Sequence, residues 1–164
     1  DDVAAPARVA TGPLYRFFPS KAALFVEVVS RVSEREVGLV EAIARRKEGR
    51  PNELFVQAVR IFATRALSNR RLAYALIVEP SDPEVEAVRL LYRRKLAHAF
   101  ASIIEAGMNS NEFSPQNPSV SGTCIVGALM EALIGPLAKE DADSEALISD
   151  IERFCTAAIR RKAT

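Results

Sequence analysis

The sequence predicts an all-α protein, and three observations carry that prediction. Apolar residues recur at intervals of three and four along most of the chain, which is the spacing of an amphipathic helix. Runs of β-branched residues and alternation with a period of two, the marks of strands, are nearly absent. Proline and glycine divide the periodic segments into lengths typical of globular helices. We therefore expect a bundle of helices.

The first half of the chain is expected to form three helices. The first begins after Ser20, whose side chain can cap it, and ends near residues 45–47, where cations suit the negative end of the helix dipole. A Gly-Arg-Pro break follows. Asn52 is expected to cap the second helix, which ends near residues 68–69, and a short third helix spans residues 71–78.

Three further helices are expected in the second half. Asp82 caps the first of them, with Pro83 at a position where its missing N–H costs nothing, and this helix ends at Gly107. A connector rich in Asn, Ser and Pro leads to an apolar helix that runs roughly from Val120 to Leu137. The last helix, from Ser144 to Arg161, shows a clear three-four pattern.

Composition agrees with a soluble globular protein. The chain has 164 residues, of which 49% are hydrophobic and 26% are charged. The formal net charge is only +1, so the chain as a whole has no strong positive potential that would attract nucleic acid, and any basic patch must be local. The two cysteines are expected to be buried thiols in a reducing cytosol. Without a membrane-length apolar stretch or a secretory start, a cytoplasmic protein with no membrane partner is predicted.

The helix predicted at residues 120–137 is apolar nearly all round, and Glu131 is its one ionisable residue. A helix packed on one side of a monomer shows a polar face, so something must cover more than one side. A homodimer seam, in which this helix and the last one form half of a four-helix bundle, explains the pattern. The central helix of a single bundle would explain it equally. The seam residues that we favour are Val120, Gly127, Ala128, Ala132, Ile151, Cys155 and Ala158.

The N-terminal residues can form two short helices joined near residues 7–9, with the second at residues 11–18. In a helix-turn-helix such a second helix enters the DNA major groove. Thr11, Tyr15 and Arg16 supply hydroxyls and a guanidinium for phosphates and base edges. Lys21, in the first turn of the next helix, can hold a phosphate. Basic and aromatic residues in a short helix are more often ordinary surface and core, so the chemistry alone is a weak signal.

The pattern of these residues is more specific than their chemistry. Residues 9–25 read VATGPLYRFFPSKAALF and closely resemble the recognition helix and following helix start of the TetR family of bacterial transcriptional repressors. The spacing that carries the resemblance is Gly-x-Leu-Tyr, then Phe-Pro-Ser-Lys, then Leu-Phe. Residues 72–80, 111–113 and 126–137 are similar to the ligand-binding core and dimer helix of one branch of that family.

This resemblance implies an all-helical homodimer in two parts. Residues 1–45 would form an N-terminal helix-turn-helix domain, whose first helix is absent from this chain, with the start of the connecting helix. Residues 46–164 would form a larger effector-binding and dimerisation domain. The implied contacts to double-stranded operator DNA are Thr11, Gly12, Tyr15, Arg16 and Lys21. Phe18 and Leu24 would lie in the core of the small domain, and we expect the family's first helix to belong before Asp1.

Two residues depart from the family's pattern. Pro6 falls inside the presumptive second helix, and Arg8 stands at the turn position where the family usually has glycine. The favoured function is a ligand-responsive transcriptional regulator, a repressor released from its operator by a small-molecule effector. Because of Pro6 and Arg8, a helical homodimer that binds a ligand or protein partner without specific DNA binding stays open as the alternative.

An effector pocket is expected between the helices that begin at Asn52, Arg71 and Asp82, closed by the dimer helix. The candidate lining residues are Phe62, Tyr74, Ile77, Tyr92, Leu96, Phe100 and Met130. Such residues are more often plain core than ligand contacts. If they do line a pocket, they favour an apolar or aromatic effector with few polar anchors.

The sequence shows no pattern of catalytic residues, metal ligands or cofactor binding. It has no nucleophile beside a base, no paired carboxylates and no phosphate-binding glycine loop, so an enzyme is not expected. His98 is expected on the surface, and residues 93–95 are expected to form a solvated cationic face. Glu79 is expected to be a capping partner of Arg70 or Arg71. For Glu131, a place at the interface and a place facing the pocket both remain open.

Overall fold

The computed structural model describes residues 18–139 and 144–161, and these residues form six helices. They are α3 (Lys21–Ala44), α4 (Pro51–Ser68), α5 (Arg70–Ile77), α6 (Pro83–Asn109), α7 (Pro118–Leu137) and α8 (Ser144–Ile159). Within the described ranges there is no strand, only one isolated bridge between Phe113 and Arg160. The all-α prediction is confirmed.

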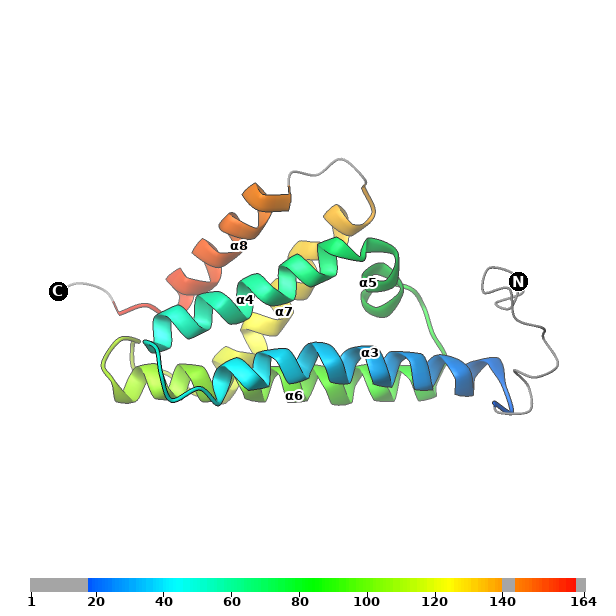
Figure 1. The fold of residues 1–164 in the computed structure, drawn as a ribbon, viewed down its shortest axis with the longest axis horizontal. Coiled ribbons are helices and arrows are strands. Elements are labelled where there is room, and N and C mark those ends of the chain that lie inside the picture. Colours follow the sequence, from blue (N-terminus) through cyan, green and yellow to red (C-terminus); the bar gives the residue numbers. More distant parts are fainter. Residues whose placement is uncertain (1–17, 140–143, 162–164) are drawn as a thin grey trace.

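The two longest helices form the base of the molecule. α3 and α6 lie side by side and run in the same direction, while α4, α7 and α8 cross them on one side (Figure 1). α6 also packs extensively against α7, and α4 packs against α3, α6, α7 and α8. The short α5 follows α4 and packs against α7. α4 is therefore the central helix of the bundle.

Three phenylalanines lie at the centre of the core. The ring of Phe55, on α4, meets Phe100 on α6 edge-on, with ring centroids 5.7 Å apart. It meets Phe113, in the α6–α7 connector, in the same way at 6.0 Å. Gly107 makes room for this arrangement, because a Cβ at that position would lie 2.1 Å from the Phe113 ring. The connector is thus fixed against the two helices by aromatic packing.

Most predicted helix ends lie within two residues of the observed ones, and one predicted cap is wrong. Ser20 caps α3 as expected, because its Oγ accepts a hydrogen bond from the Ala23 N–H at 3.0 Å. Asn52 is not the cap of α4, which begins at Pro51. Proline is suited to a first helical position because that residue needs no N–H donor, so the helix starts at Pro51, two residues before the start that an Asn52 cap implies. Asp82 occupies the N-cap position of α6 but makes no capping bond through its side chain.

The apolar helix α7 passes close to α6 at a glycine. A Cβ on Gly122 would lie 2.4 Å from the Ala97 carbonyl oxygen, so the two backbones approach as closely as they do only because no side chain intervenes. By length and composition α7 is long and apolar enough to cross a membrane, contrary to the sequence expectation. One such helix is a weak indication, since the core helix of a soluble protein meets the same criteria.

Replacing Gly122 with alanine is expected to lower the free energy of unfolding by about 1–3 kcal/mol, the usual range for overpacking. The new methyl group would press on backbone atoms of α6, which cannot move aside as a flexible side chain can. Gly38→Ala on α3 is the matched control, because nothing lies within 4 Å of the Cβ it would add. The control should stabilise α3 by roughly 0.5–1 kcal/mol. Urea denaturation of both variants tests this, and equal stabilities would contradict the close approach at Gly122.

Candidate ligand pocket

A cavity of about 360 Å³ lies between α3, α4, α5, α6 and α7. Its apolar wall comes mainly from α4 and α5, and α7 contributes Met130. This volume falls within the usual range of small-molecule sites, which are concave, largely apolar and carry a few fixed polar groups. The cavity is therefore large enough for a small organic ligand.

Five of the seven residues predicted to line a pocket do line this cavity: Phe62, Ile77, Tyr92, Leu96 and Met130. Tyr74 is half-buried and packs against the core instead. Phe100 lies one turn beyond Leu96 on α6 and is fully buried against Phe55. These two residues, which do not line the cavity, pack in or against the bundle core. The spacing of apolar residues in a sequence cannot distinguish a core position from a position in a cavity wall.

α3 also contributes to the cavity wall, which the sequence pattern did not predict. Val32, Ser33 and Val37 line the cavity, although α3 was assigned to the N-terminal part of the chain as a connecting helix. The apolar periodicity of this helix was visible in the sequence, but its partner was not. The cavity therefore includes residues on both sides of position 45, and α3 joins it directly to the N-terminal residues.

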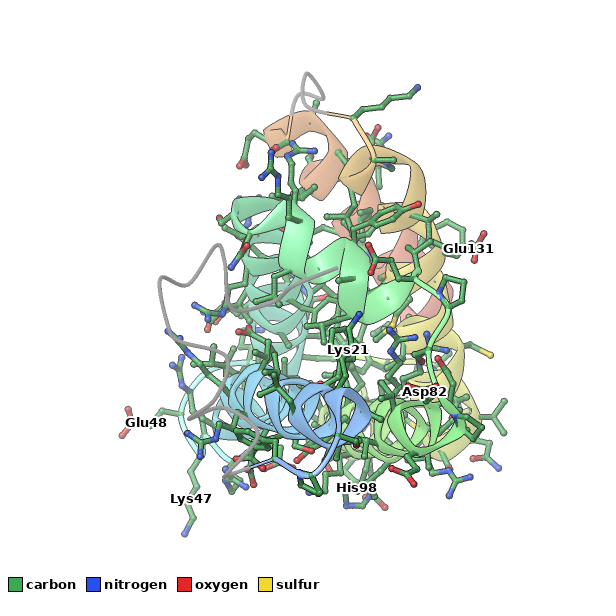
Figure 2. The ribbon with its side chains drawn as sticks, turned by 90° about the vertical axis from the view of Figure 1, so that its right-hand side faces the viewer. Lys21, Lys47, Glu48, Asp82, His98 and Glu131 are labelled. Atoms are coloured by element: carbon green, nitrogen blue, oxygen red, sulfur yellow. The ribbon has the colours of Figure 1, made fainter. Side chains whose placement is uncertain are left out.

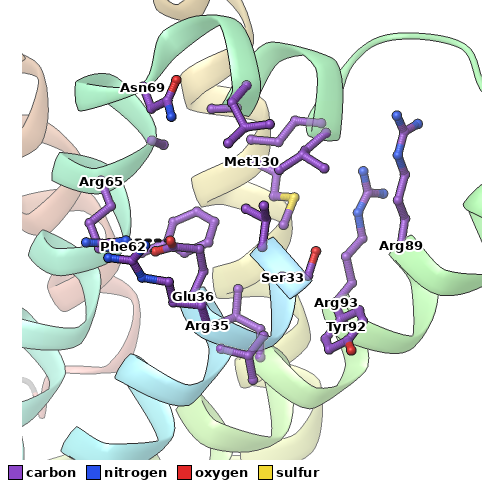
Figure 3. Close-up of a pocket in the computed structure, with 18 of the residues that line it drawn as sticks. Ser33, Arg35, Glu36, Phe62, Arg65, Asn69, Arg89, Tyr92, Arg93 and Met130 are labelled. Atoms are coloured by element: carbon purple, nitrogen blue, oxygen red, sulfur yellow. Dashed lines mark hydrogen bonds and ion pairs between the residues drawn. The ribbon is translucent and has the colours of Figure 1, made fainter. Parts of the chain in front are cut away.

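The charge of the cavity was also missed. One glutamate, Glu36, lines it together with five arginines, Arg31, Arg35, Arg65, Arg89 and Arg93. Arg65 and Glu36 form a two-point ion pair between α4 and α3, with Nη2 and Oε1 2.7 Å apart. Arg31 pairs with Glu27 on the outer part of α3. Figure 3 shows the Arg65–Glu36 pair on one side of the cavity, and Arg89 and Arg93 together on the other.

Arg89 connects α6 to the end of α5 and the segment that follows it. It is only 6% exposed and donates hydrogen bonds to the Ala75 carbonyl at 2.6 Å and to the Glu79 carbonyl at 2.8 Å. It also pairs with Glu86. A hydrogen bond from the Ser81 hydroxyl, followed by Arg89 itself, lowers the pKa of Glu86, so this carboxylate is ionised at neutral pH. The Nε of Arg89 is buried and has no hydrogen-bond partner.

Two expectations about charged residues near this cavity are wrong. The Glu79 carboxylate is exposed, and Arg70 donates instead to the Pro136 and Lys139 carbonyls, at 2.6 Å and 2.9 Å. Arg93 does not belong to a solvated face, because it is half-buried and lines the cavity. It follows Arg89 by four residues and so lies on the same side of α6. Its neighbour Arg94 is exposed, as predicted.

The structure describes one of the predicted DNA contacts. Lys21 is the first residue of α3, and it is exposed. Because Ser20 caps this helix, Lys21 stands at the positive end of the helix dipole, where a phosphate binds favourably. Thr11, Gly12, Tyr15 and Arg16 lie outside the described residues. Their role stays a prediction.

The predicted seam residues divide between two environments. Val120, Gly127, Ala132 and Ala158 are exposed, and Ala128 is half-buried. Ile151 and Cys155 are buried inside the chain's own core and offer no side chain to a second copy. Both residues lie on the face of α8 that packs against the rest of the chain, because they are spaced by three and four residues from Ile148 and Ile159, which are also buried.

The outward face of α8 carries a residue that the sequence analysis did not select. Phe154 is 65% exposed, and on α7 Val120 is 58% exposed. Glu131 extends from the outer side of α7, away from the cavity (Figure 2). We call Val120, Gly127, Glu131, Ala132, Phe154 and Ala158 the outer face of α7 and α8. Large exposed apolar side chains of this kind mark an interaction surface when they lie together.

The cysteines and the histidine have simple environments. Cys124 is exposed, contrary to the prediction of two buried thiols. Cys155 is buried as predicted, and burial raises its pKa to about 11, which makes the thiol unreactive at neutral pH. His98 is exposed, as expected (Figure 2). In the described part of the chain, no three His, Cys, Asp or Glu side chains are grouped to hold a metal ion.

Comparison with known proteins places this fold among regulators. A family model described as the C-terminal domain of tetracyclin repressor-like proteins matches residues 52–154. The fatty acid degradation regulator FadR from Bacillus halodurans is similar, with a TM-score of 0.84, 17% identity, and coverage of 97% of this chain and 84% of that one. The comparison with curated proteins gives no significant match.

Two further structures share the fold. FadR from Bacillus subtilis, in complex with stearoyl-CoA, has a TM-score of 0.81 at 16% identity and covers 96% of this chain and 86% of its own. A TetR/AcrR-family transcriptional regulator from Thermobifida fusca has a TM-score of 0.73 at 21% identity, with coverage of 98% and 86%. At these identities the likeness concerns the fold.

Proposed function

The chain belongs to the tetracyclin repressor-like family, and from that premise we propose that it is a ligand-responsive transcriptional regulator that binds operator DNA as a homodimer. The observation that supports this most directly is the course of α3. This helix carries Lys21 at its first position and lines the cavity with Val32 and Val37. One rigid element therefore joins a phosphate-binding helix end to a ligand pocket.

The proposed mechanism follows from that geometry. At 1.5 Å per residue, Lys21 and Val37 are about 24 Å apart along α3. A ligand that fills the cavity presses α3 away from α4 and α6, and the far end of the helix moves with it. Two recognition helices reach successive half-sites only at one separation. The ligand thus favours a conformation in which the pair no longer fits the operator, and the repressor is released.

The homodimer is proposed to form through the outer face of α7 and α8. Gly127, Ala132 and Ala158 are small and exposed, so helices of a second copy can approach closely. Phe154 and Val120 supply apolar area that a monomer leaves in water. Pairing these helices across a two-fold axis completes a four-helix bundle, which is a common solution for helical dimers.

The effector is proposed to have an apolar or aromatic body. Phe62, Ile77 and Met130 line the cavity and favour such a ligand. The complex of a similar fold with stearoyl-CoA supports this, since that ligand carries a long apolar chain. Residues 1–45 are proposed to read DNA with Thr11, Tyr15 and Arg16. The alternative, a dimer that binds its ligand without DNA, predicts no specific operator binding.

Lys21→Ala is expected to weaken operator binding by the homodimer by about a hundredfold, because one charge-assisted phosphate contact is lost in each of the two half-sites. The slope of log affinity against log salt should fall in magnitude by about two units, one for each Lys21 of the dimer. Fluorescence anisotropy with DNA from upstream of the gene, at two salt concentrations, measures both quantities. Lys47→Ala is the control, since Lys47 is exposed beyond the opposite end of α3 (Figure 2). Equal affinities of the two variants would remove Lys21 from the interface, and salt-insensitive or absent binding by the parent chain would favour the alternative.

A further inference from the structure

We propose that the ligand of this cavity is an amphipathic anion, with an apolar body held between α4, α5 and α7 and an anionic head group bound by Arg93. The inference rests on the proposed function for its regulatory meaning and deepens it by naming the class of ligand. Its physical basis is the set of cations on the α6 side of the cavity. An uncharged apolar effector would leave these cations unused.

Arg93 is the first of two independent observations. Its side chain lines the cavity and is half-buried, yet it makes no hydrogen bond or ion pair with any of the described residues. Removing a guanidinium from water without a partner is unfavourable, so such groups are usually exposed or paired. Arg94, the next residue, is exposed to solvent. Arg93 is therefore the cation of this helix that a ligand in the cavity can neutralise.

Arg89 is the second observation. Its two terminal nitrogens are used by the Ala75 and Glu79 carbonyls and by Glu86, but its buried Nε has no acceptor. That nitrogen has almost no accessible surface, so a ligand in the cavity cannot reach it, and Arg89 contributes its positive charge to this wall rather than a hydrogen bond. Arg89 and Arg93 project from α6 in the same direction (Figure 3). An anionic head group bound by Arg93 therefore also lies near the positive charge of Arg89.

The acidic residues nearby do not cancel this charge. Glu36 forms an ion pair with Arg65 on the side of the cavity opposite Arg93. Glu86 forms an ion pair with Arg89 and accepts a hydrogen bond from the Ser81 hydroxyl. Glu27 pairs with Arg31. Each of these carboxylates thus has its own hydrogen-bonded partner. Arg93 lies near enough to Glu86 to help lower the pKa of that carboxyl, but it makes no hydrogen bond or ion pair with any of the described residues. The cavity attracts an anion and repels a cation, and the low dielectric of its walls strengthens both effects.

The remaining wall fits an apolar body. Leu72, Leu76 and Ile77 of α5 face Phe62 of α4 and Met130 of α7 across the cavity. Methionine adapts its shape to irregular ligands, and the aliphatic residues exclude water around the chain. A ligand with a charged end and an apolar remainder therefore matches this lining, in which apolar side chains accompany the cation of Arg93. A fatty carboxylate and its coenzyme A thioester both have this chemistry.

Isothermal titration calorimetry of the full chain tests the proposal with three probes that share one apolar tail: decanoate, decanoyl-CoA and decanol. At least one anion is expected to bind about tenfold or more tightly than decanol, as a charge-assisted hydrogen bond to an arginine predicts. Arg93→Gln should remove that advantage without changing decanol binding. Arg93→Lys should retain part of it. Arg94→Gln is the matched control and should leave all three affinities unchanged.

The two anions distinguish the source of the head group. Tighter binding of decanoate identifies a free carboxylate, whereas tighter binding of decanoyl-CoA identifies a thioester whose phosphates supply the charge. The proposal is overturned if neither anion binds, if decanol binds as tightly as both, or if Arg93→Gln leaves the affinity of the anions unchanged. No DNA is present in this experiment, so its failure is separate from a failure of operator binding.

Discussion

Replacing Phe154 with aspartate is expected to convert the homodimer into a monomer and to reduce operator affinity by about a hundredfold or more, the effect of losing a central aromatic contact. Phe154 is 65% exposed and lies on the outer face of α7 and α8. An aspartate buried in the proposed interface would also carry a charge without a partner, which is unfavourable. Because one monomer reaches one half-site, loss of the dimer removes most of the operator affinity.

Sedimentation analysis reports the oligomeric state, and fluorescence anisotropy reports operator affinity. Leu90→Asp is the matched control, since Leu90 is also a large exposed apolar residue, at 48%, but lies on α6. It should remain a dimer. Phe154 makes no contribution to the buried core, so circular dichroism of Phe154→Asp should be that of a folded helical protein. A Phe154→Asp variant that stays dimeric would place the interface elsewhere.

The helices could be predicted because their signals are local. A capping hydroxyl at Ser20 and a proline at residue 83 each predict a helix start independently of the tertiary structure. In the structure Ser20 caps α3, and α6 begins at Pro83. The start of α4 was misplaced because two local signals competed there. Asn52 is a good cap, but Pro51 is a better first residue, and the backbone N–H of Asn52 is used by Glu112 at 3.3 Å instead. The partner sixty positions away is not a local signal.

The cavity could be predicted only in part, because it depends on which helices meet. Phe62 and Met130 were selected as apolar residues on the right helices, and both line it. Arg93 stands in a run of three cations that indicates a solvated face, and only the position of α5 across from α6 places it in a wall. Phe100 has the same periodicity as Leu96, yet packing against Phe55 puts it in the core.

Arg89→Met is expected to lower the free energy of unfolding by about 1–3 kcal/mol, the usual cost of leaving hydrogen-bonding groups without their partner. The substitution keeps much of the volume of the side chain, so the loss comes from polar groups left without partners. The Ala75 and Glu79 carbonyls would each lose a donor, and Glu86 would lose its ion pair. Urea denaturation measures the effect.

The matched control for this variant is Arg93→Met, one turn further along α6. Arg93 has no hydrogen-bond or ion-pair partner among the described residues, so its replacement should change the free energy of unfolding by less than about 1 kcal/mol. The two arginines therefore separate stability from binding: Arg89 holds the end of α5 against α6, whereas Arg93 is free for a ligand. Hydrogen exchange should show faster exchange in α5 for Arg89→Met alone. Equal stabilities of the two variants would mean that the α5–α6 contact does not depend on Arg89, and α5 would then have to be held by its packing against α7.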